Sequence, residues 1–374
     1  MKIGIGFYMG GVERDGIGWS ITHLVQHLLR TGSSHTFVLF TNLPVEAIRT
    51  EFQDAPNLKV VAVRAQRYTV WEQIALPRAI KAERPDVFHS PLGLPLLCSA
   101  PGIATIHDLC FLTHPETFTS RMRLYFRVFL PLAARKARIV ATDSLASKKT
   151  LMELLRVPEG KIRVVPNGIA EDFKPVRDPD AIARVREKYR LPERFILYVG
   201  TIEPRKNVLR LLQAYQRLWK SDRVEEKLVI VGKRGWLSQH VFEFLETSGV
   251  KDRVVYPGYV ARQDLPVVYS ASTAFIYPSL CEGFGLPPLE AMACGVPVVA
   301  SNTSSLPEIL GSAAYLVDPL DVDGLAGAIR QVLTDGRLQA MLRERGLERT
   351  SLYHWDTAAR RVMGVYEEVA GRRR

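Results

Sequence analysis

Two glutamates, with glycines between them, mark the segment of the sequence best suited to bind a ligand. The stretch Ser279–Asn302 reads SLCEGFGLPPLEAMACGVPVVASN and places Glu282 and Glu290 eight residues apart. The apolar run 274–277 predicts a strand before them, and Pro287 predicts the first turn of a short helix. Unpaired backbone amides at a helix start, together with the helix dipole, favour an anion such as phosphate.

The two carboxylates are better suited to bind hydroxyl groups than to bind that anion. A carboxylate beside a phosphate is repelled, whereas it accepts hydrogen bonds from the neutral hydroxyls of a ribose or a sugar. We expect Glu282 at the end of the strand and Glu290 about one turn into the helix, so that one ligand could contact both. The competing interpretation is a pair of solvated surface glutamates, joined by glycines that only turn the chain.

A basic loop follows another predicted strand. The strand FILYVG leads into TIEPRKN, which places Thr201, Arg205 and Lys206 before a predicted helix. Cations at a helix start oppose the dipole unless an anion is bound, so this loop predicts a phosphate site, although basic residues at loop ends are common. Two further strands end in loops with candidate contacts at the same sheet edge: Lys233, Tyr259 and Val260.

The first half of the chain holds two more candidates. His107 and Asp108 end a predicted strand, at the edge where open α/β sheets bind ligands, although a lone histidine is more often structural. Gly16, Ile17 and Gly18 form a predicted loop between a strand and a helix. Its spacing departs from G-x-G-x-x-G, so a nicotinamide cofactor is disfavoured; the glycines could still approach a phosphate or could only form a turn.

The composition is that of a globular chain with room for two cores, since 47% of its 374 residues are hydrophobic and 24% are charged. The cysteines Cys98, Cys110, Cys281 and Cys294 have no C-x2-C spacing, so we expect reduced, buried thiols rather than disulfides or a zinc site. A D-x-D at Asp321 is better explained by a helix cap, so no metal is expected. No apolar run is long enough to span a bilayer, which predicts a soluble, cytoplasmic protein.

The formal charge of +11 favours anionic partners. No zinc finger, recognition helix or interleaved aromatic and basic motif is present, so nucleic acid is not expected. Phosphorylated small molecules and an anionic membrane surface are simpler partners, and a solvated basic surface without a binding role is the third interpretation. A basic amphipathic helix predicted over 121–138 could lie on a membrane, but we favour packing of its apolar face on the sheet.

Alternating strands and helices predict an α/β fold with parallel sheets. The strand, loop and helix pattern of the N-terminus recurs at Phe195, after a polar stretch with three prolines, so two similarly built halves are expected. The first domain is predicted at residues 1–172, a connection at 173–193 and the second domain at 194–352. The C-terminal helix predicted over 353–374 has an apolar face that could dock back on the first half.

Short motifs along nearly the whole chain make it similar to the retaining glycosyltransferases of family 4, which have the GT-B fold. In order, they are GIG (16–18), TIHDL (105–109), VVPNGI (164–169), YVGTIEPRKN (198–207), EGFGLPPLE (282–290), LPEILG (306–311) and VDP (317–319). Each motif is weak alone, whereas their joint order is specific. The resemblance implies two Rossmann-like domains with parallel sheets facing each other across a cleft, with the acceptor bound by the first and the nucleotide sugar mainly by the second.

The resemblance also implies roles for particular residues. The implied catalytic side chains are His107 beside the sugar, Lys206 and Arg205 at the diphosphate, and Glu282 at the sugar hydroxyls. The implied donor contacts are Gly16, Ile17, Gly18, Thr201, Gly283, Phe284, Gly285, Leu286, Lys233, Tyr259, Val260 and, at the ribose, Glu290, with Asp108 as an acceptor contact. Many relatives carry an arginine at the position of Thr201, so Arg205 either replaces that cation or only flanks Lys206.

The implied reaction is retaining, metal-independent transfer of a hexose to a glycan or lipid-linked saccharide, as in polysaccharide biosynthesis, without a cofactor. The style of the motifs is most similar to bacterial mannosyltransferases that use GDP-mannose, with peripheral contact to the inner face of the plasma membrane. A UDP- or ADP-sugar donor is the alternative within the family. A nucleotide-sugar epimerase and a non-catalytic protein that binds nucleotide sugars are the alternatives of other classes.

Overall fold

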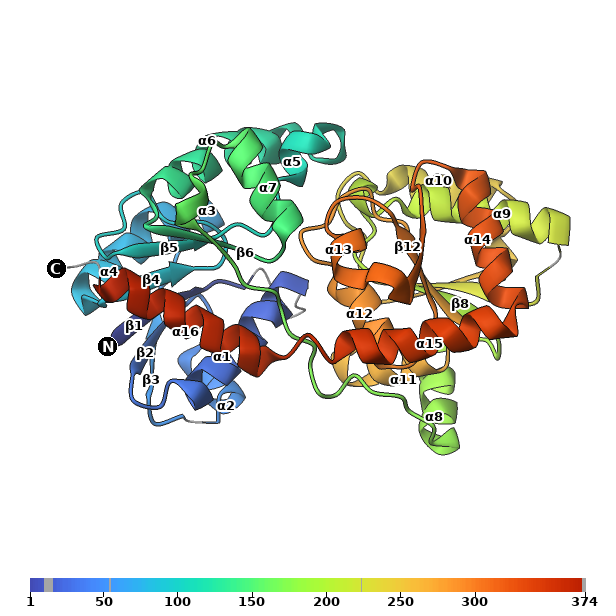
Figure 1. Ribbon diagram of the computed structural model, residues 1–374, viewed down its shortest axis with the longest axis horizontal. Helices are drawn as coiled ribbons and strands as arrows, with labels where there is room; N and C mark the ends of the chain where they lie inside the picture. Colours follow the sequence, from blue (N-terminus) through green and yellow to red (C-terminus); the bar gives the residue numbers. More distant parts are fainter. Residues whose placement is uncertain (10–15, 54, 223, 372–374) are drawn as a thin grey trace. The chain divides into compact units, whose positions relative to one another are not determined.

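The computed structural model describes residues 1–9, 16–53, 55–222 and 224–371. The chain forms two compact units (Figure 1). Unit 1 comprises Met1–Leu109, Leu124–Gly168 and His354–Arg374, and unit 2 comprises Cys110–Arg123 and Ile169–Tyr353. The sequence also predicts a loop with Glu13, Arg14 and Asp15 before Gly16, and these three residues lie outside the described residues. The predicted boundaries did not anticipate that a short segment of the first half packs within unit 2.

Unit 1 is built on a seven-stranded parallel sheet of order β3-β2-β1-β4-β5-β6-β7. Its strands are β1 (Lys2–Phe7), β2 (Thr36–Thr41), β3 (Leu58–Ala62), β4 (Val87–Ser90), β5 (Gly102–Thr105), β6 (Ile139–Thr142) and β7 (Ile162–Val164). The central strands are buried along their length, as expected for a parallel sheet with helices on both faces. Strands β2 and β3 are added on one side of β1, and β4 to β7 on the other side, so the topological switch point lies between β1 and β4.

The crossover segments of unit 1 contain one helix with an unusual turn. The helical segment is continuous through Pro77, because five residues of π-helix lead directly into the α-helical turn that begins at Leu76. The helical segments are α1 (Gly16–Thr31), α2 (Val45–Glu51), α3 (Tyr68–Val70), η1 (Trp71–Ala75), α4 (Leu76–Glu83), α6 (Ser120–Lys136), α7 (Leu145–Leu154), η3 (Glu159–Lys161) and α16 (Trp355–Gly371).

Helix α6 is the basic helix predicted over 121–138, and its packing differs from the prediction. Only Ala133 and Ala134 are buried in it, whereas Leu124, Val128 and Leu132 are 68%, 46% and 39% exposed. These three residues are spaced by four and therefore share one helix face. Within the described part of the chain, no helix is both long and apolar enough to cross a bilayer.

The C-terminal helix α16 completes the core of unit 1. It packs against α1, which is visible in Figure 1 as the red helix beside the blue one. The hydroxyl of Tyr366 lies 2.8 Å from Nδ1 of the buried His89 on β4, and Asp356 pairs with His27 on α1. The apolar face predicted for this helix therefore docks on unit 1.

Unit 2 is built on a six-stranded parallel sheet of order β10-β9-β8-β11-β12-β13. Its strands are β8 (Phe195–Val199), β9 (Lys227–Val231), β10 (Val254–Gly258), β11 (Ala274–Tyr277), β12 (Val298–Ser301) and β13 (Ala314–Val317). Its longer helices are α8 (Pro179–Tyr189), α9 (Val208–Asp222), α10 (Gln239–Thr247), α11 (Leu265–Ser270), α12 (Leu286–Ala293), α13 (Leu306–Leu310), α14 (Val322–Thr334) and α15 (Gly336–Thr350). Asp321 caps α14 by accepting a hydrogen bond from the Gly324 amide, as predicted.

The short segment Cys110–Arg123 contains α5 (Cys110–Thr113) and η2 (Pro115–Thr117) and packs within unit 2. The indole Nε1 of Trp236 donates to the Thr117 carbonyl oxygen at 2.8 Å, and its ring stacks on Phe118 with 6.0 Å between centroids. The chain therefore leaves unit 1 after Leu109 and returns to it at Leu124.

Candidate active site

The loop between β8 and α9 is fixed by one buried asparagine. It contains the short turn η4 (Pro204–Lys206) and ends at Asn207, which has a left-handed backbone with φ of 59°. The Asn207 amide donates to the carbonyl oxygens of Pro278 at 3.0 Å and Pro319 at 2.7 Å. Because these carbonyls follow β11 and β13, three strand ends of unit 2 are held together at the carboxyl edge of its sheet.

The predicted residues Lys206, Arg205 and Glu282 converge in this place. Lys206 Nζ donates to Glu282 Oε1 at 2.6 Å, and Arg205 Nη1 donates to Glu282 Oε2 at 3.1 Å. The Tyr277 hydroxyl donates to Glu282 Oε1 at 3.0 Å, and the Ser279 hydroxyl donates to the same oxygen. The carboxylate is only 8% exposed. Four side chains therefore donate to the buried Glu282 carboxylate. The competing interpretation, a solvated glutamate on the surface, is excluded for Glu282.

The charge state of Glu282 follows from these contacts. Burial acts to raise the pKa of its carboxyl, but the charges of Lys206 and Arg205 outweigh burial and lower the pKa to about 2. Burial lowers the pKa of Lys206, and the neighbouring Arg205 adds to that effect. The carboxylate consequently stays ionised at neutral pH, and its attraction holds both cations at the end of β11.

Glu203 is a member of this cluster that sequence reasoning missed. Its Oε1 accepts from Arg205 Nη2 at 2.8 Å and from Arg205 Nε at 3.1 Å, and the side chain is 3% exposed. Burial raises the pKa of Glu203. Arg205 is thus clamped between two carboxylates, and the acidic residue two positions before it in TIEPRKN was the signal that could have indicated the clamp.

The glycine loop between Glu282 and α12 depends on Gly285. This residue has φ of 98°, and a Cβ atom there would lie 2.6 Å from Leu306 Cδ2. The Ser305 hydroxyl donates to the carbonyl oxygens of Glu282 at 2.9 Å and Phe284 at 3.2 Å. With Gly285 at its N-cap, α12 has no side-chain cap. The amides that were predicted to hold phosphate or sugar, those of Phe284, Gly285 and Leu286, therefore belong to a fixed loop that follows Gly283.

Glu290 lies in the second turn of α12 and is 8% exposed. The Tyr269 hydroxyl donates to its Oε2 at 3.2 Å, and Arg262 Nη1 lies 3.4 Å from its Oε1. Burial raises the pKa of Glu290, and the charge of Arg262 opposes that effect. Sequence reasoning did not predict Arg262, because nothing in its spacing connects the short turn η6 (Arg262–Asp264), which precedes α11, with α12.

The remaining predicted contacts of unit 2 lie along the same sheet edge. Lys233 Nζ is 5.5 Å from the ring centroid of Tyr259. The Val260 side chain is 2% exposed and belongs to the hydrophobic core, so only its backbone is available to a ligand. Thr201 lies where the loops that follow β8 and β9 touch through their backbones. A Cβ atom added at Gly232 would lie 2.0 Å from the Gly200 carbonyl oxygen, so the contact requires glycine at position 232.

His107 lies at the carboxyl edge of the unit 1 sheet with an aspartate partner that was not predicted. Its Nδ1 is 2.6 Å from Asp143 Oδ2, and its Nε2 is 2.9 Å from the Pro91 carbonyl oxygen. Burial acts to lower the pKa of His107, but the Asp143 carboxylate outweighs it and raises the pKa to about 9. The ring is therefore an imidazolium that donates from both nitrogens, next to the half-buried Asp108.

The predicted glycine loop of unit 1 requires a correction. Helix α1 begins at Gly16, so Gly16, Ile17 and Gly18 form its first turn and not a loop. The sequence prediction started the helix later because glycine is a poor helix former in an interior position. At a helix start the backbone amides have no intrahelical partner, and glycine there lets another group approach the backbone closely.

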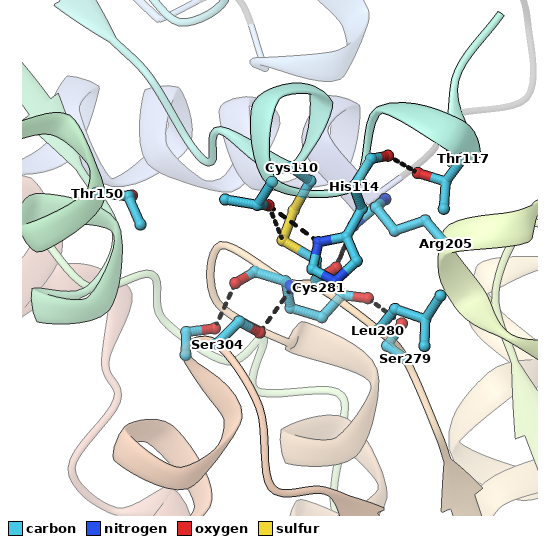
Figure 2. The surroundings of a disulfide bond; sticks show 12 residues. Cys110, His114, Thr117, Thr150, Arg205, Ser279, Leu280, Cys281 and Ser304 are labelled. Atoms are coloured by element: carbon cyan, nitrogen blue, oxygen red, sulfur yellow. Dashed lines mark hydrogen bonds and ion pairs between the residues drawn. A yellow bond between two sulfur atoms is a disulfide. The ribbon is translucent and has the colours of Figure 1, made fainter. Parts of the chain in front are cut away.

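The prediction that all four cysteines are reduced thiols was wrong. Cys110 on α5 and Cys281, the residue before Glu282, form a disulfide (Figure 2). Cys98 and Cys294 are free and buried. The two bonded cysteines are 171 residues apart, so no spacing rule could pair them. Arg205 Nη1 donates to the Cys281 carbonyl oxygen at 2.9 Å, which joins the disulfide to the charged cluster.

The class of the protein follows from this fold and site. Two α/β units with parallel sheets, one of them with a basic loop and two buried glutamates beside a glycine loop, define a glycosyltransferase of the GT-B fold. A solved structure of the same fold is sucrose-phosphate synthase from Thermosynechococcus elongatus, with a TM-score of 0.79, 23% identity and coverage of 99% of each chain. The model of Glycosyltransferase Family 4 matches residues 14–173, and that of Glycosyl transferases group 1 matches residues 181–349. The chain belongs to this family of glycosyltransferases.

Two curated relatives are mannosyltransferases of Escherichia coli. O-antigen chain mannosyltransferase B is 36% identical over 266 residues, which are 71% of this chain and 70% of that protein. Serotype-specific mannosyltransferase WbdA is 29% identical over 264 residues, which are 69% of this chain and 32% of that protein. The comparisons confirm the predicted family, the α/β GT-B fold and the enzyme class, a hexosyltransferase.

Proposed function

We propose that this enzyme transfers mannose from GDP-mannose, with retention of anomeric configuration and without a metal ion, to a glycan or a lipid-linked saccharide. The observation that carries the proposal is the buried cluster in which Lys206 and Arg205 converge on Glu282. The choice of mannose is supported by the 36% identity with O-antigen chain mannosyltransferase B of Escherichia coli.

The cluster suggests how the reaction is driven. When the bond between the anomeric carbon and the phosphate breaks, negative charge grows on the departing nucleoside diphosphate. Lys206 and Arg205 can turn from Glu282 toward those phosphates, and two cations in a site with little water stabilise such charge strongly. Glu282 is then free to accept hydrogen bonds from the sugar, and Glu290 from the ribose. The acceptor hydroxyl attacks the same face, and its proton passes to the departing phosphate.

A transfer assay tests the proposal. The purified enzyme is incubated with mannotriose and, in separate tubes, with GDP-mannose, UDP-glucose or ADP-glucose, each with and without EDTA. We expect a product one hexose heavier only with GDP-mannose, an α-linkage by NMR, and an unchanged rate in EDTA. A new nucleotide sugar formed without acceptor would indicate an epimerase, and donor binding without turnover would indicate a binding protein; both outcomes contradict the proposal.

We further propose that α6 brings unit 1 to the inner face of an anionic membrane, where a lipid-linked acceptor would lie. The exposed Leu124, Val128 and Leu132 share a face of a helix that also carries Arg121 and Arg127. Such a combination binds lipid through buried apolar area and through attraction to anionic headgroups. Sedimentation with vesicles tests this: Val128→Asp should lower binding to anionic vesicles, whereas Leu352→Asp, at an exposed leucine of unit 2, should not.

A further inference from the structure

Unit 1 contains a group of aromatic side chains around one buried carboxyl group, here called the tyrosine cluster. Its members are Tyr8, Tyr68, Trp71, Glu72 and Tyr125. The Tyr8 ring lies 4.8 Å from that of Tyr68 and 5.0 Å from that of Trp71, between centroids, and the rings of Tyr68 and Tyr125 are 6.3 Å apart. None of these residues takes part in the active site described above.

The tyrosine cluster is assembled from segments that leave the same edge of the sheet. Tyr8 directly follows β1, and Tyr68 to Glu72 lie in α3 and η1, after β3. Tyr125 lies in the first half of α6, after β5, and Gln73 Oε1 accepts from the Leu96 amide, in the connection after β4, at 3.0 Å. The cluster thus lies at the carboxyl edge and includes the switch point between β1 and β4, where open α/β sheets bind ligands.

The carboxyl group of Glu72 organises the cluster. It is 3% exposed and accepts from the Tyr68 hydroxyl at 2.8 Å, from the Tyr125 hydroxyl and from Gln73 Nε2 at 2.8 Å. Burial raises the pKa of Glu72, against the effect of these three donors. Burying a carboxyl group is costly, and this one is carried by a five-residue π-helix, a feature that is frequent at functional sites.

The arrangement leaves three tyrosine rings partly exposed, and Glu72 fixes the hydroxyls of two of them, Tyr68 and Tyr125. Trp71 is buried, and its Nε1 donates to the Val63 carbonyl oxygen at 2.9 Å, so it is a fixed packing partner of the Tyr8 ring. Tyr8, Tyr68 and Tyr125 are half-buried. A tyrosine hydroxyl that donates to Glu72 can still accept a hydrogen bond from a ligand hydroxyl.

These properties match one kind of ligand. A sugar ring has faces of C–H groups, which pack on aromatic rings, and hydroxyls at its edge, which need donors and acceptors. The cluster contains a carboxyl group and no cation, so it disfavours a phosphate or diphosphate. The part of a ligand that it can bind is therefore neutral saccharide.

We propose that the tyrosine cluster is a saccharide subsite that binds the acceptor glycan. That the cluster binds a saccharide follows from its own side chains. That this saccharide is the acceptor rests on the proposed sugar transfer. Tyr8 and Tyr125 supply ring faces, and Glu72 fixes the hydroxyls of Tyr68 and Tyr125 as hydrogen-bonding groups for the sugar.

The test measures binding of mannotriose by titration calorimetry and saturation-transfer NMR. Tyr8→Ala and Tyr125→Ala should each weaken binding about tenfold, since loss of one aromatic contact costs about 1 kcal/mol. Tyr125→Phe keeps the ring and should lose less. Tyr315→Ala, at a half-buried tyrosine of unit 2, is the matched control and should bind mannotriose like the wild type. In turnover, the cluster variants should raise KM for the acceptor and leave KM for the donor unchanged.

Three results would overturn the proposal. The first is a wild-type enzyme that does not bind mannotriose. The second is equal binding by wild type, Tyr8→Ala and Tyr125→Ala, which is the result for residues that only pack the core. The third is an increase in the donor KM in place of the acceptor KM. A thermal-shift titration with GDP-mannose separates this proposal from the first one: absence of a shift contradicts the donor assignment, whereas mannotriose binding that depends on Tyr125 still supports the subsite.

Discussion

The Nζ atom of Lys206 lies 2.6 Å from Oε1 of Glu282, in a place where the lysine side chain is 12% exposed and the glutamate 8%. The glutamate neutralises the cation to which the proposed reaction assigns the departing diphosphate, and it keeps that cation at the carboxyl edge of the unit 2 sheet. A buried pair of this kind is costly to break, because the remaining charge has no partner in a site with little water. A bound diphosphate can replace the carboxylate as the partner of the lysine.

Removal of the lysine should therefore damage catalysis more than donor binding. We expect Lys206→Ala to lower kcat by about 10²- to 10³-fold, the effect of losing one group that stabilises developing charge. Initial rates at saturating GDP-mannose measure this. Lys220→Ala, an exposed lysine in the last turn of α9, is the control and should keep the wild-type rate. A rate of Lys206→Ala within twofold of the control would contradict the assigned role.

The pair of His107 and Asp143 predicts a pH dependence of stability. The pKa of His107 is raised from 6.5 to about 9, so protonation favours the folded state. This contribution is fully present below pH 6.5 and is lost as the pH rises to about 9; its size is on the order of 3 kcal/mol. His89, with its pKa lowered to about 3 by burial, stays neutral throughout this range.

Urea unfolding of wild type and Asp143→Asn at several pH values between 6 and 9.5, roughly the range in which His107 titrates, measures that contribution. The free energy of unfolding should differ most between the two proteins below pH 6.5 and should converge toward pH 9, because the variant lacks the carboxylate that raises the His107 pKa. A difference that stays constant with pH would show that His107 does not titrate in this range.

The disulfide predicts a stability that depends on reductant. Cys110 and Cys281 close a loop of 171 residues, and a cross-link of this kind stabilises by about 2–5 kcal/mol through the unfolded state. We expect TCEP to lower the melting temperature of the wild type and Cys110→Ser to have a low melting temperature that TCEP does not change. Cys98→Ser removes a buried free thiol and should respond to TCEP like the wild type. Equal melting of Cys110→Ser and oxidised wild type would contradict this.

Local patterns in the sequence predicted the two parallel sheets, and they drew attention to the loops that follow the strands, because strand ends, glycine loops and basic loops are short-range features. The family resemblance placed Lys206 and Glu282 in one site, but their direct pairing was not predicted. They meet because β8 and β11 are neighbours in a parallel sheet, whose carboxyl ends share one edge. The glutamate pair also followed from its own spacing around a helix start.

Contacts between distant segments were not accessible in the same way. Asp143 reaches His107 from another strand, Arg262 reaches Glu290 from another helix, and the disulfide joins segments 171 residues apart. Each of these contacts depends on tertiary packing, which one sequence does not encode as a spacing. The tyrosine cluster was missed for the same reason, since its members come from three connections of the sheet, those after β1, β3 and β5.

The start of α12 depends on a backbone conformation that only glycine adopts easily. Gly285 has φ of 98°, and an added Cβ would lie 2.6 Å from Leu306 Cδ2. Gly285→Ala should therefore destabilise the protein by about 1–3 kcal/mol and weaken donor binding, since the loop amides must move. Gly364 lies in the interior of α16, where an added Cβ would have no atom from outside the local helix backbone within 4 Å, so Gly364→Ala should stabilise by about 0.5–1 kcal/mol. Chemical unfolding and GDP-mannose titration of both variants measure the two effects, and an unchanged donor affinity in Gly285→Ala would show that the loop amides do not contact the donor.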